Sequence, residues 1–112
     1  MTPLSPPVLG EFELLVVLAV LKLRDNAYPL AVADEIEATT ARKASRPAVL
    51  ITLQRLEEKG LLTSHYGAPT PVRGGRSKRL FSPRPLAVAA VKQSLGRIKA
   101  MTRGLAALLD VK

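Results

Sequence analysis

The first predicted helix is apolar on nearly every side. Residues 14–21 read Leu-Leu-Val-Val-Leu-Ala-Val-Leu, within a stretch of helical pattern over residues 10–23. A surface helix shows one apolar stripe, so a helix that is apolar all round is expected to be buried all round. In a chain of 112 residues the other elements can hardly cover such a helix, and a second subunit is expected to help.

Two amphipathic helices are predicted next, over residues 30–39 and 45–59. Pro29 suits the first turn of the helix over residues 30–39. Ser45 can cap the start of the helix over residues 45–59, and Gly60 is expected to end it. The apolar stripe of the earlier helix consists of Val32, Ala33 and Ile36. At about 100° per residue, the side chains of the later helix divide into two faces. The core face holds Val49, Leu53 and Leu56, with Leu50 beside them, and the outer face holds Ser45, Arg46, Ala48, Ile51, Thr52 and Arg55.

A β-hairpin follows these three helices. Residues 61–66 are predicted as a strand and residues 78–81 as its return. The connection between them, GAPTPVRGGRS, is rich in glycine and proline and is therefore expected to be a long hairpin loop.

A long helix is predicted at the end of the chain. It begins at Ser82-Pro83, or only after Pro85, and is expected to continue to about Leu109. Its apolar positions recur at steps of three and four over roughly three heptads, which favours pairing with a helix of another chain. The alternative is a helix that folds back on its own domain. These apolar positions are Val88, Val91, Leu95, Ile98, Leu105 and Leu109.

The expected fold class is therefore mainly α with a small β-hairpin (α+β). Residues 1–8 contain three prolines and are expected to form a flexible N-terminal arm. Residues 9–82 are expected to form a winged helix-turn-helix domain, and residues 83–112 a C-terminal dimerisation helix.

The composition argues against an enzyme. The chain has no cysteine, which excludes disulfides, a thiolate nucleophile and Cys-ligated zinc or iron–sulfur sites. With His65 as its single histidine, a histidine-based metal centre or a catalytic triad is not expected, and no cofactor is predicted. The start of the chain lacks a basic segment, and the apolar run of residues 14–21 is too short to span a bilayer. The expected location is the cytoplasm.

Positive charge is concentrated in the middle of the chain. The net charge is +8, and residues 42–84 carry ten Lys and Arg against two Glu. Residues 1–41, by contrast, carry six acidic residues against two basic ones. Charge localised in this way is typical of a surface that binds a polyanion, most often a nucleic acid.

The order of three helices and a hairpin with a basic tip predicts binding to double-stranded DNA. In a winged helix-turn-helix the third helix enters the major groove and the hairpin, or wing, lies along adjacent phosphates. In and before the third helix, the expected contacts are Arg42, Lys43, Ser45, Arg46, Ala48, Ile51, Thr52 and Arg55. In the wing they are Thr70, Arg73, Gly74, Arg76 and Lys78. The alternative is a basic dimeric adaptor that docks on an acidic protein or on structured RNA.

Four segments together resemble the PadR-like transcriptional regulators: LGEFELLVVLA at residues 9–19, Ala-Tyr at 27–28, RLEEKGLL at 55–62, and PTP with RGGR at 69–76. The resemblance implies a homodimeric repressor whose first and last helices form the dimer, with a small-molecule effector near that interface. The dimer residues would be Phe12, Leu15, Val88, Val91, Leu95, Ile98, Leu105 and Leu109. The chain departs from the family early in the third helix, where Pro47 and Leu50 replace the usual Gly and Tyr.

Overall fold

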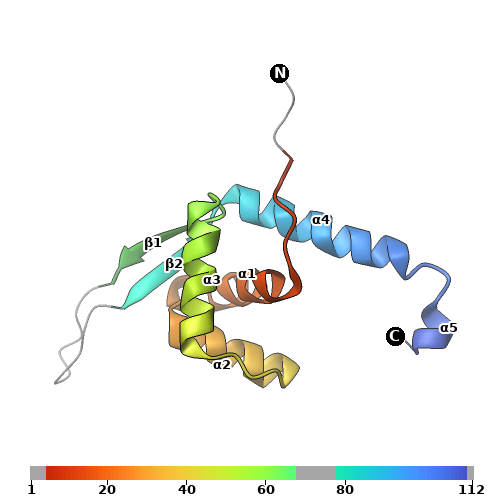
Figure 1. The fold of residues 1–112 in the computed structure, drawn as a ribbon, viewed down its shortest axis with the longest axis horizontal. Coiled ribbons are helices and arrows are strands. Elements are labelled where there is room, and N and C mark those ends of the chain that lie inside the picture. The colour runs from red at the N-terminus through yellow and green to blue at the C-terminus, as the bar shows by residue number, and fades with distance from the viewer. Residues whose placement is uncertain (1–4, 68–77, 111–112) are drawn as a thin grey trace.

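The computed structural model describes residues 5–67 and 78–110 as a mainly helical fold with one small hairpin (Figure 1). The elements in chain order are α1 (Glu11–Leu23), the short 3-10 helix η1 (Arg24–Asn26), α2 (Pro29–Thr40), α3 (Arg46–Glu58), β1 (Leu62–Tyr66), β2 (Arg79–Pro83), α4 (Pro85–Met101) and α5 (Ala106–Leu109). The predicted fold class is confirmed, since three helices precede an antiparallel hairpin and a further helix follows it.

The ends of α3 form as the sequence predicts. The hydroxyl oxygen of Ser45 accepts a hydrogen bond from the backbone amide of Ala48, at 3.2 Å. At the other end, Gly60 adopts a left-handed φ of 79°, which costs glycine little. The backbone amide of Leu61 then donates to the carbonyl of Leu56, at 3.0 Å. Both caps satisfy backbone groups that a helix end leaves without partners.

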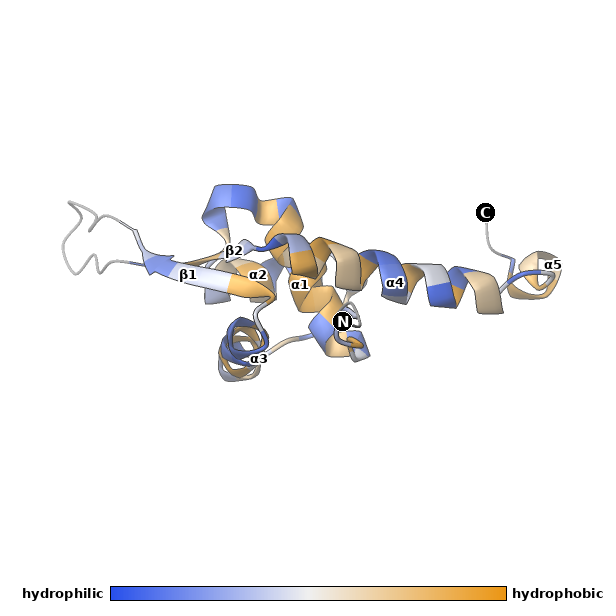
Figure 2. Ribbon diagram, turned by 90° about the horizontal axis from the view of Figure 1, so that it is seen from above, coloured by the Kyte–Doolittle hydropathy of each residue, from blue (hydrophilic) through white to orange (hydrophobic). Residues whose placement is uncertain are grey.

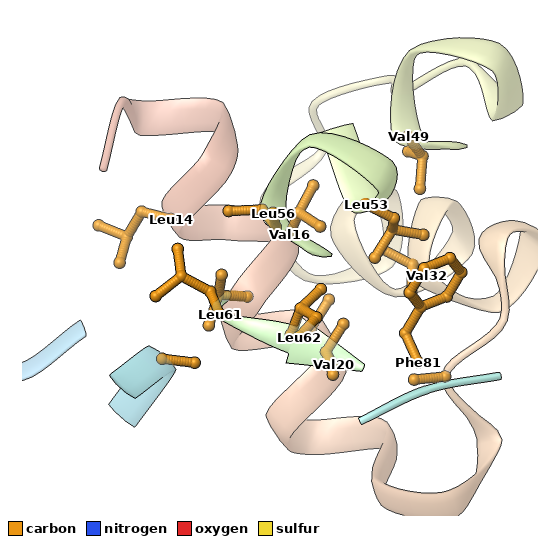
Figure 3. Packing of buried hydrophobic residues seen from close by; sticks show 14 of the residues in the cluster. Leu14, Val16, Val20, Val32, Val49, Leu53, Leu56, Leu61, Leu62 and Phe81 are labelled. Carbon is orange, nitrogen blue, oxygen red and sulfur yellow. The ribbon is translucent and has the colours of Figure 1, made fainter. Parts of the chain in front are cut away.

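One hydrophobic core joins α1, α2, α3, the hairpin and the start of α4. Figure 3 shows α1, α3 and the hairpin converging on it. The predicted core face of α3 and apolar stripe of α2 are both buried, and Leu50 is half-buried beside the core. The labelled core residues are Leu14, Val16, Val20, Val32, Val49, Leu53, Leu56, Leu61, Leu62 and Phe81.

The hairpin is tied to this core through its second strand. β1 and β2 pair from Leu62 opposite Pro83 to Tyr66 opposite Arg79. Phe81, in the middle of β2, is buried, and its backbone amide donates to the carbonyl of Ala27, at 2.8 Å. The hairpin therefore leaves the domain from a fixed base. The centre of the predicted loop, residues 68–77, lies outside the described residues.

The final helix is shorter than the sequence pattern predicts. α4 begins at Pro85, the later of the two predicted starts, because Pro83 belongs to β2. It ends at Met101, and Gly104 adopts a left-handed φ of 81° before α5 begins. The prediction of one helix as far as Leu109 is wrong, because α4 ends at Met101 and the left-handed Gly104 turns the chain before α5 begins. Figure 1 shows α4 projecting from the domain with α5 at its far end.

α1 is only partly covered by the other elements of the chain. Its core-facing residues are buried, but Phe12, Leu15, Leu18 and Leu21 are only half-buried against the core. This agrees with the prediction that the other elements of the chain can hardly cover α1, and burial of these residues by a second subunit stays a prediction. As for membranes, the helices formed by residues 5–67 and 78–110 are too short or too polar to cross a bilayer.

A salt bridge between α1 and the end of α3 makes stability depend on pH. The carboxylate of Glu13 accepts from Lys59 Nζ at 2.8 Å and from the backbone amide of Gly10 at 3.0 Å. Burial alone would raise the pKa of Glu13, but these hydrogen bonds, with the charges of Lys59 and Arg55, outweigh it and lower the pKa. A carboxylate whose pKa is lowered by folding stabilises the fold above its unfolded-state pKa. That contribution is lost as the pH falls through the lower, folded-state pKa.

Glu13→Gln is therefore expected to flatten the acid side of the stability profile. The free energy of unfolding, measured in urea at a series of pH values, should fall less steeply below the ordinary glutamate range than in the parent. Glu37→Gln removes an equal charge from an exposed position on α2 and corrects for net charge. If the free energy of unfolding of Glu13→Gln falls with decreasing pH as steeply as that of the parent, the proposed role of the Glu13–Lys59 salt bridge is contradicted.

Candidate nucleic-acid interface

α3 presents an exposed outer face that is small or apolar in its middle and basic at its ends. Arg46, Ala48, Ile51 and Arg55 are all exposed there, as predicted. Thr52 is not, because only 7% of its surface is exposed. The prediction that Thr52 lies on the outer face is wrong: it is one turn from both core residues Val49 and Leu56, and it shares their side of the helix.

The segment before α3 is held by α1 rather than left free. The guanidinium of Arg42 bonds the carboxylate of Glu11 at 3.1 Å and lies 5.0 Å from the centroid of the Phe12 ring. Ser45 uses its hydroxyl oxygen as the cap of α3. Lys43, between them, is exposed. Arg42 and Lys43 are the two basic residues of this segment that were expected to contact a nucleic acid. Arg42 is already bound to α1, a contact that the sequence did not indicate.

A network of three polar side chains braces α3 against the hairpin. The guanidinium of Arg79 bonds the carboxylate of Glu57 at 2.7 Å, and the hydroxyl of Ser64 donates to the same carboxylate at 2.7 Å. Arg79 Nε also donates to the Ser64 hydroxyl, at 3.2 Å. Arg79 thus serves this brace, the Glu57–Arg79–Ser64 network, which fixes the direction of the hairpin relative to α3.

The structure describes only the base of the predicted wing. Lys78 is exposed, and its ammonium lies 4.1 Å from the centroid of the Tyr28 ring. A cation in this position is attracted by the ring face. The other predicted wing residues, Thr70, Arg73, Gly74 and Arg76, lie outside the described residues.

A cleft of about 390 Å³ separates the start of α3 from the base of the hairpin. Three basic side chains and two phenols meet in it, together with apolar residues at the start of α2. Its lining residues are Tyr28, Pro29, Leu30, Arg46, Leu50, Tyr66, Lys78 and Arg79. Of these residues, only Arg46 and Lys78 are predicted from the sequence to bind. Tyr66 could have been suspected from its position at the end of a predicted strand, next to the basic loop.

α4 and α5 carry most of the predicted dimer residues. Val88, Leu95, Ile98, Leu105 and Leu109 are exposed, and α5 is coloured hydrophobic in Figure 2. Phe12 and Leu15 of α1 are half-buried. Val91 was also predicted to lie in the dimer interface, but it is 6% exposed and belongs to the core of its own chain. The heptad pattern did not separate the side of α4 that faces α1 from the side that faces away.

Metal binding has no support in the part of the chain that the structure describes. Its His, Asp and Glu side chains nowhere form a group that could hold a metal ion.

Comparison with known proteins identifies the fold. Neither a protein-family model nor a curated protein matches the chain. Among solved structures, a PadR family transcription regulator from Clostridium difficile superimposes with a TM-score of 0.70 at 19% identity, over 89% of this chain and 99% of that one. A PadR family regulator from Eggerthella lenta gives 0.65 at 19% identity, over 88% and 83% of the two chains. A transcriptional regulator from Clostridium thermocellum gives 0.67 at 16% identity, over 81% and 85%. The chain therefore has the winged helix-turn-helix fold of the PadR family transcriptional regulators.

Proposed function

We propose that this protein is a PadR-like transcriptional repressor that binds operator DNA as a homodimer, with α3 in the major groove and the hairpin along the adjacent phosphates. The observation that carries the proposal is the outer face of α3, exposed between basic residues and braced to the hairpin by the Glu57–Arg79–Ser64 network. The shared fold with solved transcription regulators supports it.

The outer face of α3 has the properties that a groove-binding helix needs. Ala48 and Ile51 are exposed in its middle, where they allow the helix backbone close to the bases and offer apolar contact to thymine methyl groups. Arg46 and Arg55 stand on either side of them, and of these two Arg55 is the one assigned to a guanine edge, which an arginine can bond through two hydrogen bonds. We therefore assign base reading to the outer face of α3.

The exposed apolar side chains of α4 support the homodimer. Leu95 is 45% exposed and Ile98 is 55% exposed, on a helix that projects from the domain (Figure 1). Apolar side chains gathered on one surface mark an interaction site, and a two-fold dimer pairs the same surface of both subunits. A hollow of about 450 Å³ between α4 and α5, lined partly by Leu95 and Ile98, lies at this surface. We place the effector implied by the family resemblance there.

Arg55→Ala is expected to weaken binding to the specific DNA site by roughly 5- to 150-fold, which corresponds to the about 1–3 kcal/mol that a good arginine–base contact provides. The DNA site would be selected with the purified protein from a random duplex library. Affinity would then be measured by fluorescence anisotropy for the selected and a scrambled duplex, and the loss should fall on the selected duplex.

Arg103→Ala is the matched control, because it removes the same charge from the exposed turn between α4 and α5. It should retain the affinity of the parent for the selected duplex. An RNA duplex of equal length serves as competitor. Preference of the parent for RNA, or parent-like binding by Arg55→Ala, contradicts the proposed use of α3.

A further inference from the structure

The cleft between α3 and the hairpin continues as a groove toward the exposed start of α3. A second hollow is lined by Pro29, Arg46, Pro47 and Leu50. It shares Pro29, Arg46 and Leu50 with the 390 Å³ cleft, so the two are parts of one depression, which we call the α3–hairpin groove. Figure 1 shows α2, α3 and the hairpin meeting at this side of the molecule.

The groove combines an apolar floor with a positively charged rim. Pro29, Leu30 and Leu50 supply apolar surface, and Arg46 and Lys78 supply charge. Among the described residues, the charge of Arg79 is taken by Glu57, whereas Arg46 and Lys78 form no salt bridge. A ligand that fits this groove has anionic groups that meet the charged rim and an apolar surface that meets the floor.

Two phenols add hydrogen-bonding groups at the hairpin side of the groove. Tyr66 is 70% exposed and stands opposite Arg79 in the strand register. Tyr28 lies under the ammonium of Lys78, so this lysine is drawn to the groove before anything binds. A tyrosine hydroxyl both donates and accepts, and tyrosine and lysine are common partners of DNA phosphate oxygens.

We propose that the α3–hairpin groove holds one sugar–phosphate strand of the bound duplex, with Lys78, Arg46 and the Tyr66 hydroxyl on its phosphates and the Pro29–Leu30–Leu50 floor against its deoxyribose. The inference rests on the proposed function, in which α3 lies in the major groove and the hairpin lies along the adjacent phosphates. The strand that carries those phosphates borders the groove that α3 occupies, so it must pass by the depression between α3 and the hairpin, and that depression has the chemistry of the strand's sides. Tyr66 and Lys78 are thereby positioning residues, since phosphate contacts set the register of a protein on DNA and carry no sequence information.

The test uses Tyr66→Phe, which removes one hydroxyl and keeps the ring. Its affinity is expected to fall about tenfold, as for a lost hydrogen bond to a charged group, and by the same factor on the selected and the scrambled duplex. Its salt dependence should match that of the parent, whereas Lys78→Ala should lower the salt slope by about one. His65→Ala is the control, because the neighbouring strand residue points to the opposite face, and it should bind like the parent.

A scan with methylphosphonate, which replaces one charged phosphate at a time by a neutral group, locates the contact. One phosphate should be found whose neutralisation weakens the parent but has a clearly smaller effect on Tyr66→Phe and Lys78→Ala. Parent-like binding by both variants, while Arg55→Ala is weakened, overturns the groove assignment and leaves the proposed function intact. If the parent binds no duplex DNA, both fail.

Discussion

Leu95→Glu is expected to convert the proposed homodimer into monomers at micromolar concentration. Leu95 lies in the exposed apolar surface of α4 and lines the hollow between α4 and α5. Burying a polar group without a partner costs at least about 2 kcal/mol, and a two-fold interface contains the substitution twice. The dissociation constant of the dimer should therefore rise roughly a thousandfold. The fold should survive, because the side chain is already partly exposed in the single chain.

Light scattering coupled to gel filtration, over a range of protein concentrations, measures this change. Ala38→Glu adds the same charge at an exposed position on α2 and should leave the dimer in place. Operator binding gives a second readout, since a dimer contacts two half-sites and a monomer only one. A dimeric Leu95→Glu protein, or a monomeric parent, would show that α4 does not form the interface.

Phe81→Ala is expected to lower the free energy of unfolding by about 3–5 kcal/mol, as is typical for the loss of a buried phenylalanine. Phe81 is fully buried and comes from the strand whose backbone bonds Ala27. Its ring also lies beneath the guanidinium of Arg79, at 5.0 Å. Removing the ring thus leaves a cavity where the hairpin joins the core, and it weakens the support of the arginine that braces α3.

Urea unfolding followed by circular dichroism measures the loss. Phe81→Leu retains most of the apolar volume and should cost less than about 1.5 kcal/mol, so the two variants separate the effect of the cavity from that of any substitution in β2. If Phe81→Ala and Phe81→Leu have the same free energy of unfolding, the buried ring does not contribute to stability as its burial indicates.

The sequence was a good guide wherever the outcome depends on neighbours along the chain. Ser45 and Gly60 bound α3 as predicted, because a cap is formed by residues within one helical turn. The core face of α3 was also predicted correctly, because helical periodicity places these side chains on one side whatever packs against them.

The sequence was a poor guide where a helix has apolar side chains over a wide part of its surface. Thr52 was assigned to the outer face of α3 and Val91 to the dimer interface, yet both are buried within the single chain. Each lies at the margin of an apolar stripe, and periodicity alone does not say how far a neighbouring element covers that margin. The break near Gly104 differs, since glycine is a poor helix former and the sequence itself therefore marks a place where a helix can end.

The sequence by itself determined the order of the first three long helices, the hairpin and a helix after it. It also determined the concentration of positive charge in residues 42–84 and the side chains that α3 offers on most of its outer face. Only the tertiary structure decided which basic side chains form salt bridges within the chain. These are Arg42 with Glu11, Lys59 with Glu13 and Arg79 with Glu57. It also decided that Tyr28, Tyr66 and Lys78 line one groove with the start of α3. The reason is physical. Caps and periodicity are set within a few residues, whereas an ion pair or a groove exists only once packing of the core has brought distant segments within a few ångströms.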